Sequence, residues 1–504
     1  MSVKEKYNSI VSHLRKLKDL SAANALLQWD QEVYMPVNGG EHRGQQLATL
    51  SAIYHELATD KTYVQNLKGL VLEDSLSFEE KRNVEEALRD AKNSMKFNVD
   101  FVKRRSLLIS KAFQTWEEAR EKNDYSVYAP VLKEMIDLKK EEARIWGFID
   151  HPYDALLDQF ERGMKSKQLE DLFEKVKENL IPFIKEIRSK ESIDESPLEG
   201  KFDKDKQWNF GLDLLKDLGY DFSRGRQDVS THPFTISFGS NDVRVTTRVK
   251  EDNISEMIWS CIHEGGHALY EQGLLEDNYG LALGDACSLS IHESQSRLYE
   301  NNLGRSKAYW IKNFDLIKSY FPENFEGVSF EAFYRAMNTV KPSLIRTSAD
   351  ELTYHFHVII RFEIEKGLMD GSIKVEELDK VWNQKYKDYL GIDVPDDNQG
   401  VLQDVHWAHG GLGYFPTYSL GSFYGAQFFA QAEKSISGLK EEIEQGNYQS
   451  LLTWLREEIH QYGKAYNSEE LCDKVTGEPL NIDYFMNYVQ EKYGEIYNLA
   501  SVEF

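Results

Sequence analysis

The chain of 504 residues is 41% hydrophobic and 12% aromatic, which supplies enough apolar surface for a large buried core. Its formal net charge of -24 disfavours nucleic acid as a partner, because phosphate binding needs basic surface, and no apolar run reaches the ~20 residues that a membrane-spanning helix needs. The N-terminus lacks the apolar core of a secretory signal, and the three cysteines form no CxxC pair, so we expect a cytoplasmic protein.

Most of the sequence repeats its apolar residues at the helical period. Residues 78–122, 166–190 and 450–466 carry apolar side chains three and four positions apart between charged ones, which is typical of helices with one buried face. Residues 189–206 are polar enough for a surface loop, and no long linker, low-complexity tract or repeat interrupts the chain. We predict a mainly α-helical fold in which residues 1–504 form a single domain.

One segment alternates instead of following the helical period. Residues 232–249 place polar and apolar side chains in alternation on either side of a Gly-Ser-Asn-Asp stretch, which is typical of two antiparallel strands joined by a tight turn. We therefore predict a β-hairpin near the middle of the chain, and hence a small β-sheet within an otherwise helical molecule.

The next predicted helix contains the sequence HEGGH. It begins near Asn253, which with Glu256 three residues later matches a capping box. His263 and His267 are one turn apart on one helical face, where two imidazoles can share a metal ion. Glu264 lies at the adjacent position, from which a carboxylate can accept a proton from water on that ion. The alternative is a pair of solvated histidines on an ordinary helix.

A zinc site that keeps one position for water has three protein ligands, so another element must supply the third. Glu271 would lie about 12 Å along the helix from His263, given the rise of about 1.5 Å per residue, and is too far away. Glu293, inside the following predicted helix, is our predicted third ligand, with Asp285 and Glu300 as weaker candidates. The alternative for Glu293 is a solvated charge on a helix surface.

Four neighbouring residues have structural interpretations. His292, next to Glu293, is expected to pack beside the ligands rather than bind the ion. Cys261 points away from the histidine face and is expected in the core. Gly265 and Gly266 cost a helix about 1 kcal/mol each, which either the close approach of another backbone or local side-chain packing would explain.

Seven short motifs lie between residues 232 and 421. They are HPF at 232–234, DVRVT at 242–246, HEGGH at 263–267, HESQS at 292–296, IRTSAD at 345–350, GVLQDVHW at 400–407 and GYFPTYSLG at 413–421. Together, and in this order, they resemble the carboxypeptidase Taq family of zinc-dependent metallocarboxypeptidases. The helical character and the length of the rest of the chain are also similar to that family.

The resemblance implies a mainly α, neurolysin-like fold, related also to angiotensin-converting peptidases, with two helical lobes, a deep groove and a small β-sheet near the metal site. It implies a metallocarboxypeptidase that hydrolyses peptide bonds and releases single residues from free C-termini with broad side-chain tolerance. It also implies one zinc ion per subunit, which cobalt can replace, and a homodimer. Peptides are then the expected partners, and neither nucleic acid nor a membrane is expected.

The resemblance also implies roles for residues of the HEGGH and HESQS motifs. His263, His267 and Glu293 would hold the zinc ion. The ion would lower the pKa of its bound water toward neutrality, and Glu264 would take a proton from that water and pass it to the leaving amine.

Charge that develops on the carbonyl oxygen of the peptide needs hydrogen-bond donors besides zinc. Similar segments in the related peptidases imply that the His- and Tyr-rich stretch after residue 405 supplies them. We favour Tyr418, with His406 or His409, and we expect Tyr414 to contact the substrate. The alternative for each tyrosine is a half-buried core aromatic.

A carboxypeptidase must also recognise a free carboxylate, which a guanidinium group binds in a two-pronged geometry. Arg346 is our predicted carboxylate-binding residue, because it lies just before Ser348, which with Glu351 matches a capping box at the start of a helix. A structural ion pair with an acidic residue of that first turn is the alternative. Arg244 in the hairpin is a second choice, for which pairing with Asp242 would indicate a scaffold role.

Two other functions are alternatives. An oligoendopeptidase would share the metal chemistry but would lack a fixed binding site for the terminal carboxylate. A non-catalytic helical binding protein with a structural zinc would prefer four protein ligands, often cysteines, where this sequence offers three candidate ligands and a glutamate in the position of a base.

Overall fold

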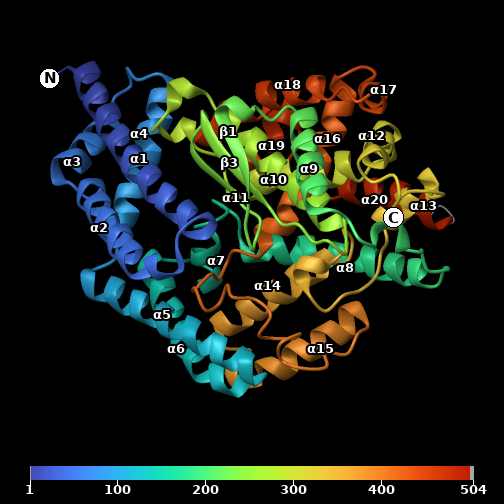
Figure 1. The fold of residues 1–504 in the computed structure, drawn as a ribbon. Helices are drawn as coiled ribbons and strands as arrows, with labels where there is room; N and C mark the ends of the chain where they lie inside the picture. The colour runs from blue at the N-terminus through green and yellow to red at the C-terminus, as the bar shows by residue number, and fades with distance from the viewer. Residues whose placement is uncertain (1, 500–504) are drawn as a thin grey trace. The chain divides into compact units, whose positions relative to one another are not determined.

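The structure is a computed structural model that describes residues 2–499, and these residues form two compact units. The first unit is built from the chain up to Met95, Asp194–Met337 and Tyr424–Asn481, and the second from Lys96–Ile193, Asn338–Phe423 and the chain from Ile482 on. Each unit is mainly helical (Figure 1), which confirms the predicted fold class. A single domain over residues 1–504 stays a prediction.

The first unit contains the β-sheet and the HEGGH helix. Its helices and strands are α1 (Val3–Val33), α2 (Gly40–Ala58), α3 (Lys61–Leu70), α4 (Phe78–Met95), α9 (Lys204–Leu218), β1 (Gly225–Val229), β2 (Thr235–Gly239), β3 (Asp242–Thr247), α10 (Ser255–Gly273), α11 (Leu289–Arg297), a π-helix (Leu298–Gly304), α12 (Lys307–Tyr320), α13 (Phe330–Met337), α17 (Leu439–Glu444), α18 (Gln449–Glu458) and α19 (Ser468–Thr476). The helix α16 (Pro416–Ser435) is divided between the two units.

The second unit contains helices and no strand among its described residues. Its helices are α5 (Val99–Lys122), α6 (Tyr125–Trp146), α7 (Pro152–Leu157), α8 (Ser166–Arg188), α14 (Tyr354–Asp370), α15 (Leu378–Leu390) and α20 (Asp483–Tyr497). The helical stretch predicted over residues 78–122 forms two helices, because the side chain of Asn98 accepts a hydrogen bond from Phe101 N at 2.8 Å and starts α5. The stretch predicted over residues 166–190 is α8.

Residues 189–206 are only partly the surface loop that their polarity predicts. Leu198 and Phe202 are buried, and the ring of Phe202 packs edge-on against Phe321, with 5.3 Å between ring centroids. α9 then begins at Lys204. The prediction is therefore wrong for these two apolar residues, because two apolar side chains among many charges still anchor a loop to a core.

The sheet has the strand order β1-β3-β2. β2 is antiparallel to β3, with Thr235 opposite Val245, which confirms the predicted hairpin. β1 pairs in parallel with β3, with Gly225 opposite Val243, and the sequence GRQDV gave no alternating pattern from which this strand could be predicted. α10 packs against β3 and β2 (Figure 1), and Val243, Val245 and Cys261 are buried there.

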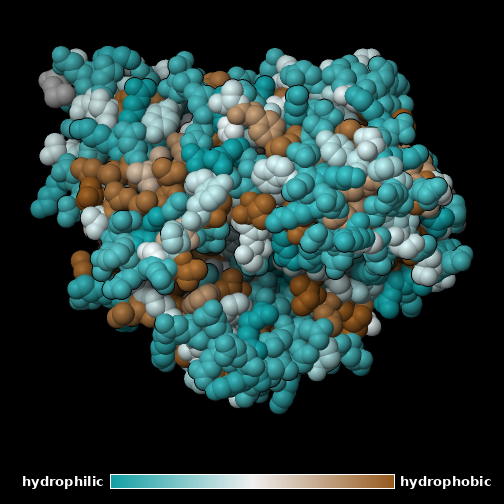
Figure 2. Space-filling model, in the orientation of Figure 1, coloured by the Kyte–Doolittle hydropathy of each residue, from teal (hydrophilic) through white to brown (hydrophobic). Residues whose placement is uncertain are grey.

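Hydrophilic residues predominate on the face shown in Figure 2, and one cluster of apolar residues on that face lies over the N-terminal helices. Leu26 of α1 and Ile53 of α2 are among the exposed apolar residues. Scattered exposed apolar residues are ordinary on protein surfaces. Among residues 2–499, no helix combines the length and the apolar composition needed to cross a bilayer.

Candidate metal centre

α10 begins without the predicted capping box. Asn253 Oδ1 accepts a hydrogen bond from Ser255 N at 2.8 Å, which satisfies one donor at the start of the helix. Glu256 forms ion pairs with Arg248 and Lys250 instead of capping the helix. Arg248 and Lys250, which follow β3, therefore pair with the carboxylate of Glu256 that the sequence pattern predicts as part of the cap.

The three predicted metal ligands converge. The ring centroids of His263 and His267 are 4.9 Å apart, and Glu293 Oε2 lies 3.4 Å from His267 Nε2 and 3.8 Å from His263 Nε2. One potential ligand atom of each residue lies within 4.8 Å of the others. Two imidazole nitrogens and one carboxylate oxygen are a donor set that zinc accepts, so the cluster fits such an ion.

Contact between the backbones of α10 and α11 brings the histidines and the glutamate together. A Cβ atom at Gly266 would lie 2.7 Å from both Gln295 O and Ser296 Cα, so only glycine allows this approach. A Cβ atom at Gly265 would lie 2.8 Å from the side-chain atom Leu215 Cδ2. Of the two explanations for these glycines, backbone approach applies to Gly266 and side-chain packing to Gly265.

The protonation states of His267 and Glu293 suit a cation. Burial, together with the nearby charge of His292, lowers the pKa of His267 to about 3, so its imidazole is neutral at pH 7. Burial opposes ionisation of Glu293, but the charges of Arg297 and His263 outweigh it and hold the pKa of Glu293 well below its ordinary value. Neutral imidazole and ionised carboxylate are the forms that bind metal ions.

The two weaker candidates for the third ligand have other partners. Glu300 Oε2 accepts a hydrogen bond from His263 Nδ1 at 2.8 Å, which is the ring nitrogen that does not face the cluster. Asp285 forms ion pairs with Lys18 at 2.8 Å and with Lys464. Neither carboxylate belongs to the converging group.

His292 packs beside the ligands, as its position next to Glu293 predicts. Its ring stacks on that of His267, with 4.5 Å between centroids, and its Nε2 lies 2.9 Å from Glu271 Oε1. His292 therefore packs against His267 without joining the cluster.

Glu264 is buried next to the cluster and contacts the sheet. Its Oε2 accepts a hydrogen bond from Thr235 Oγ1 in β2 at 2.7 Å, and burial raises the pKa of this carboxyl above its ordinary value. The sequence did not single out Thr235, although this residue directly follows the HPF motif.

Arg346, in the second unit, is buried and paired, but not with the acids predicted. Its Nε donates to Asp404 Oδ1 at 3.1 Å and its Nη1 to Tyr354 Oη at 3.2 Å. Arg361 Nε donates to Asp404 Oδ2 at 2.6 Å. Two guanidinium groups thus share one carboxylate, and the sequence did not single out Asp404 or Arg361 even though Asp404 belongs to the GVLQDVHW motif.

The predicted helix start after Arg346 is wrong. Arg346–Ser348 form a single 3-10 turn, and α14 begins only at Tyr354. Glu351 does not cap the helix, because its carboxylate accepts hydrogen bonds from Lys492 Nζ at 2.7 Å and Tyr493 Oη at 2.8 Å in α20. Glu351 therefore pairs with residues of α20, far along the chain, and does not cap α14.

Three of the four predicted residues after position 405 lie together near Arg346. The ring of Tyr418 is 5.2 Å from that of Tyr414 between centroids and 5.1 Å from the guanidinium carbon of Arg346. His406 lies 5.8 Å from Tyr414 between ring centroids, and burial lowers its pKa to about 4. His409 stacks on Phe113 of α5 at 5.3 Å, so the grouping favours His406 over His409.

A buried glutamate holds this segment in place. Glu365 of α14 is fully buried and accepts hydrogen bonds from Trp407 Nε1 at 2.8 Å, Gly413 N at 2.9 Å and Tyr153 Oη at 2.8 Å. The carboxylate thus joins α7 and α14 to the segment that carries His406. Sequence reasoning missed Glu365, because its position among the apolar residues of a helix carries no sign of its distant partners.

Arg244 has the partner that the hairpin sequence offers. Its Nε and Nη2 each donate to Asp242, at 2.8 Å and 2.8 Å, and its guanidinium carbon lies 4.4 Å from the ring centroid of Trp29 in α1. These contacts support a scaffold role, and substrate binding by Arg244 stays a prediction.

A sequence model described as carboxypeptidase Taq (M32) metallopeptidase matches residues 9–493. The chain belongs to this family. It is 40% identical over 489 residues to carboxypeptidase 1 of Bacillus subtilis, covering 96% of this chain and 97% of that protein. It is 38% identical to thermostable carboxypeptidase 1 of Thermus thermophilus, covering 99% of this chain and 100% of that protein.

Solved structures agree with this membership. The M32 carboxypeptidase from Deinococcus radiodurans R1 has a TM-score of 0.96 at 37% identity, covering 98% of this chain and 100% of that one. The Pyrococcus furiosus carboxypeptidase has a TM-score of 0.94 at 36% identity, covering 97% and 99%. The resemblance seen in the motifs is therefore confirmed, and the protein is a metallocarboxypeptidase that acts on peptides.

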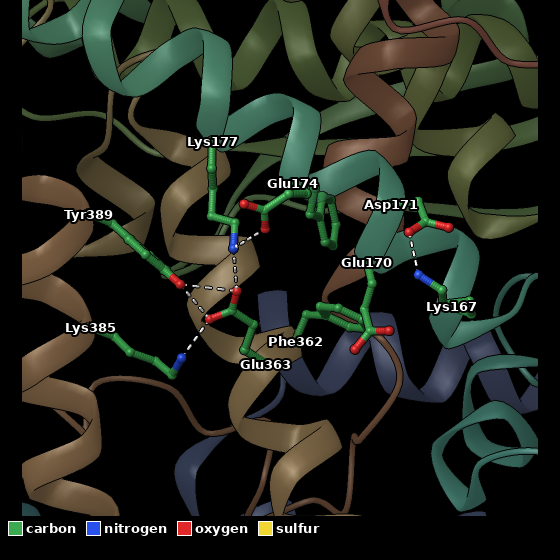
Figure 3. Close-up of a pocket in the computed structure, with 10 residues that line it drawn as sticks. Lys167, Glu170, Asp171, Glu174, Lys177, Phe362, Glu363, Lys385 and Tyr389 are labelled. Carbon is green, nitrogen blue, oxygen red and sulfur yellow. Dashed lines mark hydrogen bonds and ion pairs between the residues drawn. The ribbon is translucent and has the colours of Figure 1, made fainter.

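A cavity of about 590 Å³ lies between α8, α14 and α15 of this M32 metallocarboxypeptidase. Most of its charged side chains pair with one another (Figure 3): Glu363 accepts hydrogen bonds from Lys177 at 3.1 Å, Lys385 at 2.5 Å and Tyr389 at 2.8 Å. These pairs join three helices. The cavity therefore carries a structural ion-pair network, and the reactive groups of the HEGGH motif lie elsewhere.

Proposed function

We propose that this metallocarboxypeptidase releases single residues from the free C-termini of peptides, with broad side-chain tolerance, by means of one zinc ion held by His263, His267 and Glu293. The observation that carries the proposal is the convergence of these three side chains, with ligand atoms within 4.8 Å of one another. Neutral histidines and a charged glutamate are the donor forms that the ion requires.

The hydrolytic step is assigned to Glu264. When bound, zinc would polarise the scissile carbonyl group and make water a better nucleophile at neutral pH. Glu264 accepts the proton of the attacking water and then delivers it to the leaving amine. Its burial beside His263, and the hydrogen bond that orients it from Thr235, support this role.

Recognition of the substrate is assigned to residues of the second unit. Arg346 binds the terminal carboxylate, and Tyr418, assisted by His406, donates hydrogen bonds to the carbonyl oxygen as it gains charge. Two guanidinium groups with one carboxylate, that of Asp404, leave one positive charge uncompensated among these three groups, which supports binding of an anion by Arg346. Tyr414 contributes to the same surface through its contact with Tyr418.

A time course on one peptide in two forms tests the proposal. The free-ended peptide should lose residues one at a time from its C-terminus, as read by mass spectrometry, and a chelator should abolish the loss. The same peptide blocked as a C-terminal amide should resist. Equal cleavage of both forms would show an oligoendopeptidase, and turnover that the chelator leaves unchanged would remove the metal from the reaction.

The remaining expectations concern the state of the protein. We propose one zinc ion per subunit, replaceable by cobalt, and a cytoplasmic homodimer. Elemental analysis of purified protein gives the metal-to-subunit ratio, and sedimentation velocity gives the mass of the particle. A ratio far from one, or a monomer at micromolar concentration, would contradict these two expectations.

A further inference from the structure

The helix that carries Glu293 changes its winding directly after that residue's turn. α11 ends at Arg297, and the chain continues as a π-helix over Leu298–Gly304. A π-helical turn contains more residues than an α-helical turn, so side chains after the change point in new directions. Short π-helical segments are rare and occur frequently at functional sites.

The change of winding brings Glu300 to a metal ligand. Glu300 Oε2 accepts a hydrogen bond from His263 Nδ1 at 2.8 Å. Because an ionised carboxylate can only accept, Nδ1 must carry a proton, so that the neutral form of this imidazole has its lone pair on Nε2. That nitrogen is the one that lies 3.8 Å from Glu293 Oε2 within the cluster.

Both oxygens of Glu300 are held. Arg305 Nη2 donates to Oε1 at 3.2 Å and Arg297 Nη1 to Oε2 at 3.2 Å. The guanidinium carbon of Arg305 lies 3.8 Å from the ring centroid of Trp259 in α10, which fixes this support to the helix of the histidines. The side chain of Glu300 is buried, so these contacts are shielded from water.

Arg297 extends the same arrangement to the third ligand. Its Nε donates to Glu293 Oε1 at 2.7 Å, which leaves Oε2 directed at the two histidines. Glu293 and Glu300 are balanced by Arg297 and Arg305, so the charges of these four groups sum to zero. Nδ1 of His267, by contrast, has no hydrogen-bond partner within the part of the chain that the structure describes.

We propose that Glu300 is the positioning residue of the metal centre, placed by the π-helical turn. It selects the tautomer of His263 that binds through Nε2, and through Arg297 it fixes the carboxylate of Glu293. This inference rests on the proposed ligand set, and it adds a residue that binds no metal itself. Partners of this kind commonly change metal affinity about 10- to 100-fold when they are removed.

The test measures the dissociation constant of Zn²⁺ by competition with a chelating indicator at fixed pH. Glu300→Ala should weaken Zn²⁺ binding about 10- to 100-fold, and Glu300→Gln less, because the amide oxygen can still accept from Nδ1. The matched control is Glu271→Ala, which removes a carboxylate from His292, a histidine outside the cluster. It should change the constant by less than about threefold.

Two results would overturn the inference. One is Glu300→Ala binding Zn²⁺ as tightly as the unaltered protein, and the other is an equal loss in Glu271→Ala. His263→Ala separates this outcome from failure of the ligand set, since unchanged Zn²⁺ binding in that variant contradicts the proposed ligands themselves. If Glu300→Ala does not fold by circular dichroism, Glu300→Gln is compared with Glu271→Gln, a pair with side chains of equal size. Glu300→Gln should then show the larger loss of Zn²⁺ affinity, although a smaller one than an alanine would cause.

Discussion

Glu264 differs from the three proposed metal ligands in what its side chain contacts. It follows His263 directly in α10, yet it lies outside the converging group and accepts a hydrogen bond from Thr235. A carboxylate in this position can move a proton without holding the ion. The role of Glu264 is therefore separable from metal binding by a single isosteric change.

Glu264→Gln should retain zinc and lose at least about a hundredfold in kcat, the scale of general-base catalysis. An amide occupies the same volume but cannot accept the proton of water. The measurement is turnover of a free-ended peptide at saturating substrate, with metal content determined on the same sample. Turnover equal to that of the unaltered protein would remove Glu264 from the mechanism, and loss of the ion would make it a structural residue of the site.

At the scale of elements, the ligand geometry depends on how closely α10 approaches α11. The backbones meet at Gly266, where a Cβ atom would lie 2.7 Å from main-chain atoms of α11. Main-chain atoms of a helix cannot move away from an added Cβ atom as a flexible side chain can. The neighbouring Gly265 faces the side-chain ends of two leucines, Leu215 and Leu218. The two glycines can therefore be compared as a contact with backbone and a contact with side chains.

Gly266→Ala should destabilise the protein by about 1–3 kcal/mol, the usual cost of an overpacked core, and should weaken zinc binding as Glu293 moves away from the histidines. Gly265→Ala should be close to neutral, because the gain in helix propensity of about 1 kcal/mol offsets the displacement of Leu215. Urea unfolding measures the stability of both variants, and zinc titration measures their affinity for the ion. Equal effects in the two variants would contradict a special role for the backbone contact.

α14 is held to the segment after residue 405 by a carboxyl group that titrates unusually. Burial raises the pKa of Glu365 to about 7 from 4.5, against the opposing effect of the hydrogen bonds from Gly413 N, Trp407 and Tyr153. Because the folded pKa is raised, the stability that this group contributes is fully present below pH 4.5 and is lost as pH rises through about 7.

We therefore expect the free energy of unfolding to fall by up to about 3 kcal/mol between pH 5 and pH 7 because of Glu365. Glu365→Gln should remove this part of the dependence of stability on pH. The control is Glu363→Gln on the same helix, whose pKa the neighbouring lysines hold low despite burial. That variant should leave the dependence of stability on pH between pH 5 and 7 unchanged. The measurement is the midpoint of urea unfolding at a series of pH values. If stability depends on pH in Glu365→Gln as it does in the unaltered protein, Glu365 is not the group responsible.

At the scale of the whole molecule, sequence patterns predicted what depends on neighbours along the chain. Apolar spacing predicted α8 and the first part of residues 450–466, where α18 ends at Glu458 and a 3-10 segment follows. The pair His263 and His267 followed from one helical turn. The hairpin followed from its alternation. β1 was missed because GRQDV has one apolar residue and no alternation, so its strand conformation depends on pairing with β3.

The other features of the fold and of the candidate site could not be predicted from the sequence, because they depend on contacts between residues that are far apart along the chain. The partner of Arg346 is Asp404, 58 residues away, whereas the sequence suggested the acids of its own turn. Glu351, assigned to a local cap, pairs with Lys492, 141 residues away. Helix geometry and family resemblance predict Glu293. The sequence offers Glu300 only as a weaker candidate for the third ligand, because it gives no sign of the π-helical turn.

The balance of charge among Glu293, Arg297, Glu300 and Arg305 has a consequence for the exchange of ions. In a site built from acids alone, extraction of the cation leaves mutual repulsion that drives the carboxylates apart. Here each acid keeps a guanidinium partner when the cation departs, so the empty cluster retains its shape. We therefore expect that a bound divalent metal can be removed and replaced by a different one without refolding of the protein.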